Sequence, residues 1–237
     1  MLTKVQAEFR ALADAKKALL AQRFFKTGPG EYGAGDKFLG ISVPTTRSFL
    51  PKTDALPLTE LRSLLSSQWH EERLLALLCL VRRFNKAKQN QAQQSLIVDL
   101  YLANTQWVNN WDLVDSSAPH ILGAWLLNRE RSVLDRLAAS SVLWEQRIAV
   151  LATQTFIRKG DMRDTVRLCA LMLNHPHDLM HKACGWMLRE AGNKNPETLD
   201  AFLADHATQM PRTMLRYAIE KLTPQQRAKW MSKDKSH

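Results

Sequence analysis

The sequence contains few of the residues that interrupt helices. Glycine and proline occur nine times each in 237 residues, below the roughly 12% that the two usually make up together. β-Sandwiches and barrels need a turn about every ten residues, so this scarcity argues against both. No run beyond residue 57 alternates polar and apolar residues over the length of a strand, and the sequence therefore favours a helical fold.

Long hydrophobic stretches are also absent. The longest apolar run covers residues 74–81, far short of the roughly 20 residues that span a bilayer. The N-terminal sequence MLTKVQAEFRAL lacks the apolar core of a secretory signal. We therefore expect no membrane association and a cytoplasmic location, in contact with the nucleoid.

Cysteine is scarce and carries little information. Cys79, Cys169 and Cys184 form no CxxC motif, and each lies in an apolar helical context. This pattern is typical of buried free thiols in a reducing compartment, and the spacing gives no support to a thiol nucleophile.

Acidic residues are outnumbered by basic ones. The chain has 33 lysines and arginines against 23 aspartates and glutamates, which gives a formal net charge of +10. A basic surface can serve solubility alone, but an excess of this size in a helical protein favours a polyanionic partner such as nucleic acid.

What the sequence does contain is helical periodicity. Apolar residues recur at three- and four-residue steps over residues 2–26, which predicts a helix there. A glycine-rich segment at 28–40 follows, and Pro44 can open a short helix after it. The remaining sequence divides into predicted helix pairs: 59–68 with 70–86, 91–104 with 109–127, 130–140 with 143–159, 161–173 with 178–191, and 196–207 with 211–222.

The second helices of these pairs begin with a similar pattern. A basic residue, replaced by an aspartate in one pair, stands before apolar and small residues. The residues at this position are Arg73, Asp115, Arg147, Lys182 and Arg212, which lie 42, 32, 35 and 30 residues apart. Such spacing is close to the two-helix periods of HEAT and armadillo arrays. The sequence thus predicts an all-α HEAT-like superhelix, or α-solenoid, in which equivalent positions form a row along a basic concave groove.

This fold predicts a single domain over residues 1–222. It would comprise N-terminal helices and the glycine-rich loop at 1–57 and paired helices at 58–222. A basic C-terminal tail at 223–237 would follow, and we expect it to be frayed.

Asp115 is the one acid in this row of cations. Trp111 lies four residues earlier and shares its helix face, and the helix can be capped by either of the asparagines at 109 and 110. Asp112, in the first turn, is expected to serve the helix dipole, and Pro119 predicts a break in the helix. The acid at 115 is either a chance residue that suits a helix start or a carboxylate with a function.

A second group combines an aromatic residue with cations. Lys182 and Trp186 are four residues apart, and Arg189 follows three residues later. By residue type alone, core packing is the alternative interpretation of Trp186.

Several long blocks stand out from the helical pattern. They are GPGEYGAGDKFLGI at 28–41, followed by Val43, Pro44 and Arg47, then WDLVDSSAPHILG at 111–123, QRIAVLATQTFIRKGD at 146–161, DLMHKACGWMLREAGNKNP at 178–196 and MPRTMLRYAIEKL at 210–222. In these blocks the sequence resembles the AlkD family of DNA alkylation-repair glycosylases, and the resemblance extends roughly from residue 20 to 222.

The resemblance implies a monomeric HEAT-like superhelix that binds duplex DNA and hydrolyses the N-glycosidic bond of N3- and N7-alkylated purines without a cofactor or metal. It places catalysis on Trp111 and Asp115, an active-site arginine at Arg147 and a groove tryptophan at Trp186. A further aromatic contact with the lesion falls on Phe24 or Tyr32. Contacts with DNA are also expected from Lys182, Arg189, Arg73, Arg212 and Arg47.

These residue types suit that chemistry. An alkylpurine cation leaves as a neutral base, so the reaction needs no general acid, and the sugar becomes an oxocarbenium-like cation. A carboxylate at Asp115 would stabilise this cation, and the indole faces of Trp111 and Trp186 would attract it. Arg147 would hold a phosphate and keep Asp115 ionised.

Two alternative functions remain open at this point. One is a non-catalytic HEAT-like protein that binds damaged or branched DNA, and the other is a protein-interaction scaffold. Residues 28–33 match GxGxxG but follow a predicted helix rather than a strand. His175, His177 and His181 lack the spacing of a common zinc motif.

Overall fold

Helices account for the regular structure of residues 1–232, the part of the chain that the computed structural model describes. Within this range no strand forms, and Lys37 and Trp69 make an isolated β-bridge. Over the same residues, no helix combines the length and apolar character needed to cross a membrane. The predicted all-α helical-repeat class is confirmed, while residues 233–237 of the expected tail lie outside the described residues.

The chain divides into two compact units. Unit 1 is Met1–Ser117 and unit 2 is Ala118–His237. The expectation of one domain over residues 1–222, and that of a basic concave groove, both stay predictions.

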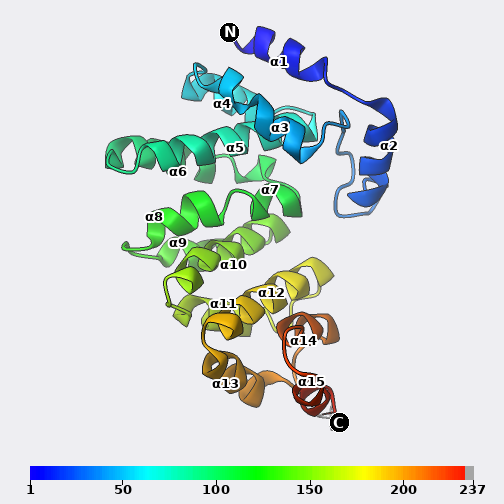
Figure 1. Ribbon diagram of the computed structural model, residues 1–237, viewed down its shortest axis with the longest axis vertical. Coiled ribbons are helices and arrows are strands. Elements are labelled where there is room, and N and C mark those ends of the chain that lie inside the picture. Colours follow the sequence, from blue (N-terminus) through cyan, green and yellow to red (C-terminus); the bar gives the residue numbers. More distant parts are fainter. Residues whose placement is uncertain (233–237) are drawn as a thin grey trace. The chain divides into compact units, whose positions relative to one another are not determined.

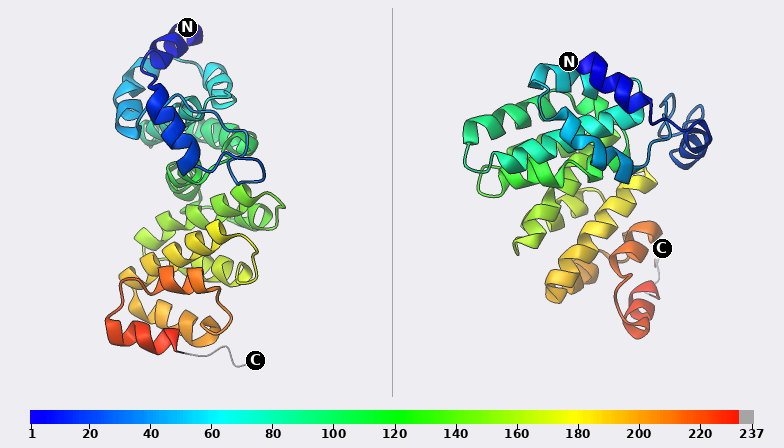
Figure 2. Two further views of the ribbon diagram at one scale, coloured as in Figure 1. Left: turned by 90° about the vertical axis from the view of Figure 1, so that its right-hand side faces the viewer. Right: turned by 45° about the horizontal axis from the view of Figure 1, so that its top comes forward.

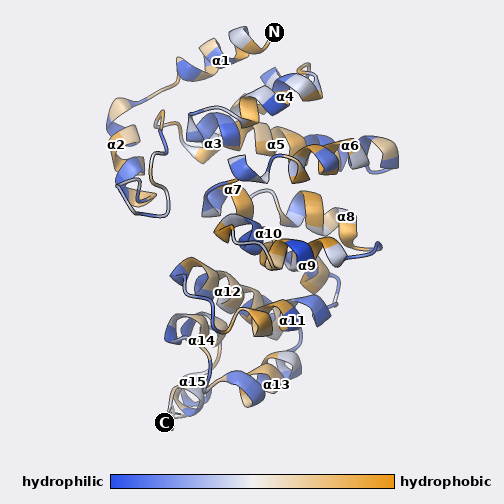
Figure 3. Cartoon of the chain, turned by 180° about the vertical axis from the view of Figure 1, so that it is seen from behind, coloured by the Kyte–Doolittle hydropathy of each residue, from blue (hydrophilic) through white to orange (hydrophobic). Residues whose placement is uncertain are grey.

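Helix α5 (His70–Lys86) is the centre of unit 1 and contacts α3, α4, α6 and α7. Residues 74–80 are all buried, as expected of a helix that is apolar all round rather than along one stripe, and Figure 3 shows this hydrophobic stretch. The other elements of unit 1 are α1 (Leu2–Arg10), α2 (Ala15–Phe24), α3 (Val43–Phe49), η1 (Leu50–Thr53), α4 (Leu58–Leu65), α6 (Gln91–Leu102), η2 (Thr105–Trp107) and α7 (Trp111–Asp115) (Figure 1).

The N-terminal segment forms two helices where the periodicity predicts one. Asp14 precedes α2, and its carboxylate accepts hydrogen bonds from the backbone amides of Lys16 and Lys17. This local cap starts a new helix, so the prediction of one continuous helix over residues 2–26 is wrong. Helix α1 buries Val5 and Phe9, whereas α2 has no buried residue.

Unit 2 consists of helix pairs whose second helices form a row. Helix α12 (Asp178–Lys194) contacts both α10 (Leu143–Arg158) and α14 (Arg212–Ala218) (Figures 1 and 2). The first helices, α9 (Ser132–Ala138), α11 (Arg163–Leu171) and α13 (Pro196–His206), pack against this row. Each of these three pairs lies within a few residues of its predicted position.

The helix predicted for residues 109–127 is interrupted. Helix α7 ends at Asp115, and a π-helical turn, η3 (Pro119–Gly123), precedes the short α8 (Ala124–Leu126). Pro119 has no N–H to donate to the carbonyl four residues earlier. The break predicted at this proline is therefore confirmed.

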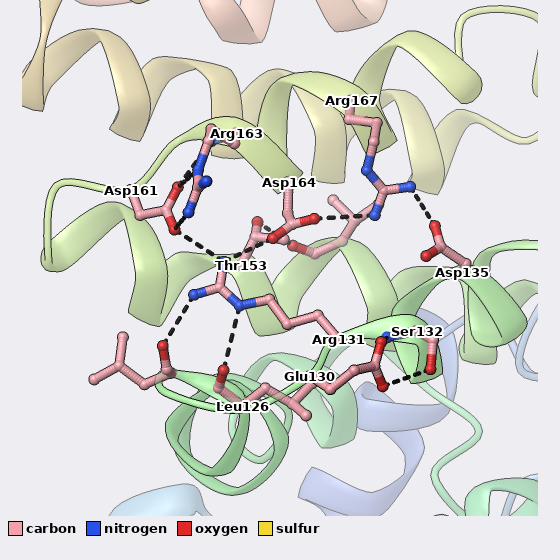
Figure 4. A network of polar contacts seen from close by, with 12 residues as sticks. Leu126, Glu130, Arg131, Ser132, Asp135, Thr153, Asp161, Arg163, Asp164 and Arg167 are labelled. Carbon is pink, nitrogen blue, oxygen red and sulfur yellow. Dashed lines mark hydrogen bonds and ion pairs between the residues drawn. The ribbon is translucent and has the colours of Figure 1, made fainter.

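An ion-pair network joins two helix pairs of unit 2 (Figure 4). Arg131 contacts the carboxylates of Asp161 at 2.9 Å and Asp164 at 2.7 Å, and it also donates to two backbone carbonyls. Arg167 of α11 pairs with Asp164 at 2.9 Å and with Asp135 of α9. Because the carboxylates are shared and Arg131 is largely buried, this network stabilises the stack more than isolated surface pairs would.

The chain beyond residue 222 is folded where a frayed tail is expected. Helix α15 (Pro224–Met231) begins with a capping box, in which Thr223 and Gln226 each accept a hydrogen bond from the other's backbone amide. The helix buries Trp230, and Arg212 donates to the carbonyl of Met231 at 3.2 Å. The expectation of fraying is thus wrong for residues 224–231.

Gly185 sets how closely α12 and α14 approach. A Cβ atom there would lie 2.5 Å from the carbonyl oxygen of Met214 and 2.5 Å from the Cβ of Tyr217. We expect Gly185→Ala to lower the free energy of unfolding by about 1–3 kcal/mol, because the helices must move apart. Urea denaturation would measure this.

Gly28→Ala is the matched control, since a Cβ at Gly28 would meet only the flexible side chain of Glu31, with its carboxylate oxygen at 2.9 Å. We expect it to change stability by less than about 0.5 kcal/mol. Equal effects of the two substitutions would contradict close packing at Gly185.

Candidate active site

Helix α7 carries Trp111 and Asp115 at its two ends. The side-chain oxygen of Asn110 accepts a hydrogen bond from the backbone amide of Trp111 at 2.8 Å, so the cap predicted at one of two asparagines is confirmed for Asn110. A helix of five residues does not form by itself in water. The full burial of Leu113 and Val114 holds this one in place.

Asp115 is half-buried, so its side chain is not enclosed in apolar packing. The negative charge of Asp115 nevertheless affects the pKa of a buried residue, Tyr101. Burial raises the pKa of Tyr101 on α6, and the negative charge of Asp115 adds to this effect. The Tyr101 hydroxyl lies 3.1 Å from that of Ser117. Asp115 thus stands where protein interior and solvent meet, which strengthens its electric field without excluding water.

Aromatic rings surround Trp111. Phe24 meets it edge to face with ring centroids 5.8 Å apart, and Phe25 stacks on it at 5.3 Å. Phe24 is 64% exposed, so these rings border solvent. The hydroxyl of Tyr32 donates to the backbone carbonyl of Phe24 at 3.4 Å. Of the two candidate aromatics, Phe24 therefore contacts Trp111 directly, and Tyr32 supports the backbone of Phe24.

A cavity of about 400 Å³ adjoins these rings within unit 1. Three phenylalanines and Trp111 contribute to its lining, and its charged or titratable groups are Lys17, His70, Glu71 and Asp112. Aromatic faces of this kind suit a flat organic ring.

His70, the first residue of α5, lies between two carboxylates. Its Nδ1 is 2.8 Å from an oxygen of Asp36, and its Nε2 is 2.8 Å from an oxygen of Asp112. Burial disfavours the charged ring, but Asp112 and Asp36 outweigh this effect and raise the pKa of His70 to about 9. The ring is therefore an imidazolium at neutral pH, and it joins the glycine-rich loop to α7.

Asp112 thus has a partner that the sequence did not indicate. It lies in the first turn of α7, as expected of an acid that serves the helix dipole, but its carboxylate pairs with His70 from α5. The two residues are 42 positions apart, so no local pattern connects them.

Three further buried charged residues follow His70 in α5. Glu71 accepts hydrogen bonds from the consecutive backbone amides of residues 39–41 at 2.8, 2.8 and 3.2 Å. Glu72 pairs with Arg10 of α1 at 2.6 Å. The sequence signal for this cluster is HEER at 70–73, four charged or titratable residues directly before an apolar run.

Arg73 is an expected DNA contact that the structure places in the interior. It is 3% exposed, pairs with Asp36 at 2.6 Å and donates to the carbonyl of Ser67. Burial would raise the pKa of Asp36, but His70 and Arg73 outweigh it and lower that pKa. A buried, paired guanidinium cannot reach a phosphate, so the expectation for Arg73 is corrected: it holds the glycine-rich loop.

Arg147, Lys182 and Trp186 belong to unit 2. Arg147 of α10 is 4% exposed and donates to the carbonyl of Leu179 at 2.6 Å, at the start of α12. Lys182 and Trp186 are half-buried and one turn apart on α12. Lys182 pairs with Asp178 at 2.8 Å.

The remaining expected contacts differ in their exposure. Arg189 is half-buried and pairs with Glu190 at 3.4 Å and with Glu220. Arg212, at the start of α14, and Arg47, in the last turn of α3, are both exposed. The structure therefore gathers Trp111, Asp115 and Phe24 in unit 1, and Arg147, Lys182, Trp186, Arg189 and Arg212 in neighbouring helices of unit 2.

Three histidines at the start of α12, two before the helix and His181 within its first turn, organise the loop that precedes it. His177 accepts a hydrogen bond from the backbone amide of Leu179 at 3.1 Å and so caps α12. His175 lies 2.8 Å from the side-chain oxygen of Gln146, and His181 lies 2.6 Å from the carbonyl of His175. Burial lowers the pKa of His175 and of His177. Within residues 1–232, no three His, Cys, Asp or Glu side chains are grouped to hold a metal ion.

Comparison with known proteins gives the family. Residues 5–222 match the family of DNA alkylation repair enzymes, and the chain belongs to this family. A solved structure described as a predicted DNA alkylation repair enzyme from Enterococcus faecalis has a similar fold, with a TM-score of 0.69 and 15% identity over 90% of this chain and 97% of that one. A search of curated proteins finds no match.

The contacts of His70 make stability depend on pH. An unfolded histidine has a pKa of about 6.5, so a folded pKa of about 9 stabilises the fold fully below pH 6.5 and progressively less as pH rises through 9. We expect the free energy of unfolding to fall over this interval by on the order of 3 kcal/mol. Asp36 acts oppositely, because its lowered pKa stabilises the fold above about pH 4.

Urea denaturation at pH 6.0, 7.5 and 9.0 would measure this dependence in the wild type and in His70→Gln, which should lack most of it. His206→Gln is the matched control, since His206 contacts the ring of Phe202 in unit 2, and it should keep the wild-type slope. A wild-type slope that persists in His70→Gln would contradict the assignment.

Proposed function

We propose that this protein is a monofunctional DNA glycosylase that removes positively charged N3- and N7-alkylated purines from duplex DNA. The observation that carries the proposal is α7, where an indole and a half-buried carboxylate stand at the two ends of one short helix. Membership of the DNA alkylation repair family supports alkylated DNA as the substrate.

The chemistry follows from the charge of the lesion. An alkylated purine leaves as a neutral base, so the enzyme must stabilise the sugar as it becomes positive. Asp115 does this electrostatically and orients the attacking water, which reaches it because the side chain is half-buried. Trp111, with Phe24 beside it, supplies aromatic faces that attract the cation.

Phosphate contacts fall to cations that reach the surface. Arg212 and Arg47 are exposed, and Lys182 is half-buried on the same helix as Trp186. Arg147 holds the start of α12 and thereby places Lys182 and Trp186. The protein acts as a monomer and needs no cofactor, because one carboxylate and aromatic faces suffice for this reaction.

Asp115→Asn removes the charge with little change of shape. We expect it to lower the single-turnover rate of 7-methylguanine release from methylated duplex DNA by at least ~10²-fold, the scale for one electrostatic stabiliser. Binding of the duplex should persist. Chromatography of the released base and fluorescence anisotropy of labelled DNA would measure the two effects.

Asp99→Asn is the matched control, since Asp99 is an exposed aspartate on α6 of the same unit, and it should keep the wild-type rate. Unchanged release by Asp115→Asn would remove this carboxylate from the mechanism. Tight binding of methylated duplex without any base release by the wild type would instead show a non-catalytic DNA-binding protein.

The salt dependence of DNA affinity distinguishes a protein that contacts phosphates from a protein-interaction scaffold. We expect Lys182→Ala to weaken DNA binding and to reduce the slope of log K against log salt by about 1, because one phosphate contact is lost. Lys194→Ala, at the other end of α12 and exposed, should leave both unchanged. A slope near zero in the wild type would favour the protein-interaction scaffold.

A further inference from the structure

We propose that His70 is a positioning residue for the active site, which fixes the first turn of α7 and with it the indole of Trp111. The inference rests on the proposed role of Trp111 in the glycosylase. It concerns a residue outside the blocks of sequence that carry the resemblance, on a different helix from the reacting groups.

The bridge that His70 makes is the first support. Its two ring nitrogens are each 2.8 Å from a carboxylate oxygen, one of Asp36 and one of Asp112. Asp36 is in turn held by Arg73 at 2.6 Å, so the far end of the bridge is anchored in α5 itself. His70 and Arg73 are only 2% and 3% exposed, which makes the arrangement rigid rather than a loose surface pair.

On its other side, His70 contacts Asp112, the residue next to Trp111. The second oxygen of Asp112 is buried and has no hydrogen-bond partner among residues 1–232, so His70 supplies the contact of this carboxylate. Helix α7 has only five residues and relies on tertiary contacts for its position. Loss of His70 leaves an unpaired carboxylate at the first turn of α7, and we expect this carboxylate to turn toward water and to shift that first turn.

Ring contacts make a second connection from His70 to Trp111. His70 stacks on Phe38 with centroids 4.5 Å apart and contacts Phe25 at 4.9 Å. Phe25 stacks on Phe38 at 5.0 Å and on Trp111 at 5.3 Å. The orientation of the indole therefore depends on His70 both through Asp112 and through Phe25. Other charged groups around this cavity are Glu71 of α5 and Lys17 of α2.

The test observes Trp111 directly, in full-length protein labelled with 5-fluorotryptophan. Substitution of Trp111→Phe assigns its ¹⁹F resonance. In His70→Gln we expect this resonance to shift and broaden, while the resonances of the tryptophans in unit 2, at 125, 144, 186 and 230, stay unchanged. His206→Gln should leave the resonance of Trp111 in place.

A double-substitution cycle tests the route through Asp112. Asp112→Asn should alter the resonance of Trp111 in the same direction as His70→Gln, and the double variant should match His70→Gln, because substitution at 70 already removes the contact with Asp112. In single-turnover assays, His70→Gln should slow base release by at least ~10-fold at unchanged DNA affinity, since a small misplacement of a reacting group is enough to do so.

An unchanged Trp111 resonance in folded His70→Gln, or additive effects of the two substitutions, would overturn the proposal. If His70→Gln unfolds unit 1, Asp112→Asn decides the matter, because a folded variant with an unmoved indole would equally refute it. If the wild type releases no base, the proposed function fails, and the ¹⁹F measurement alone still judges whether His70 positions Trp111.

Discussion

Unit 1 depends on four consecutive charged or titratable side chains that are buried at the start of α5. Removing such groups from water is costly unless each finds a partner, and here each partner comes from another segment. Arg10 of α1 neutralises Glu72, the amides of residues 39–41 surround Glu71, and carboxylates of the glycine-rich loop and of α7 flank His70. Packing of apolar residues alone would tolerate several arrangements of these segments, whereas the directed contacts select one.

Unit 2 is organised by other means. Its second helices form an apolar row, with Gly185 allowing close approach, and shared carboxylates around Arg131 join successive pairs. Repetition places comparable side chains at comparable positions, which suits contacts with the regular phosphates of a duplex. The residues that we propose to react lie instead on a helix of unit 1 that is too short to be stable alone, so contacts with several distant residues determine their geometry. The function proposed above divides accordingly, with most of the expected phosphate contacts in unit 2 and the proposed reaction in unit 1.

Local periodicity in the sequence predicts those parts of the fold that depend on neighbouring residues. The helix pairs of unit 2 and the break at Pro119 follow from burial patterns and from a missing N–H, so both were predictable. Contacts between distant residues leave no such pattern, which is why the partnership of His70 with Asp112 escaped prediction. Arg73 was misplaced for a related reason: its position in the repeat suggested a surface cation, but Asp36 draws it inward. Two local signals do mark helix starts that the periodicity does not show, the cap at Asp14 and the capping box at Thr223.

The shared position of Asp36 between His70 and Arg73 also constrains how this protein can evolve. Replacing Asp36 alone leaves Arg73 without a counterion in the protein interior, and replacing His70 alone leaves Asp112 without one. A neutral residue at 70 is therefore tolerated best together with loss of the carboxylate at 112, and loss of the carboxylate at 36 together with loss of the cation at 73. Related sequences should accordingly show these positions changing as a correlated set, even where the tryptophan and aspartate of the neighbouring short helix are retained.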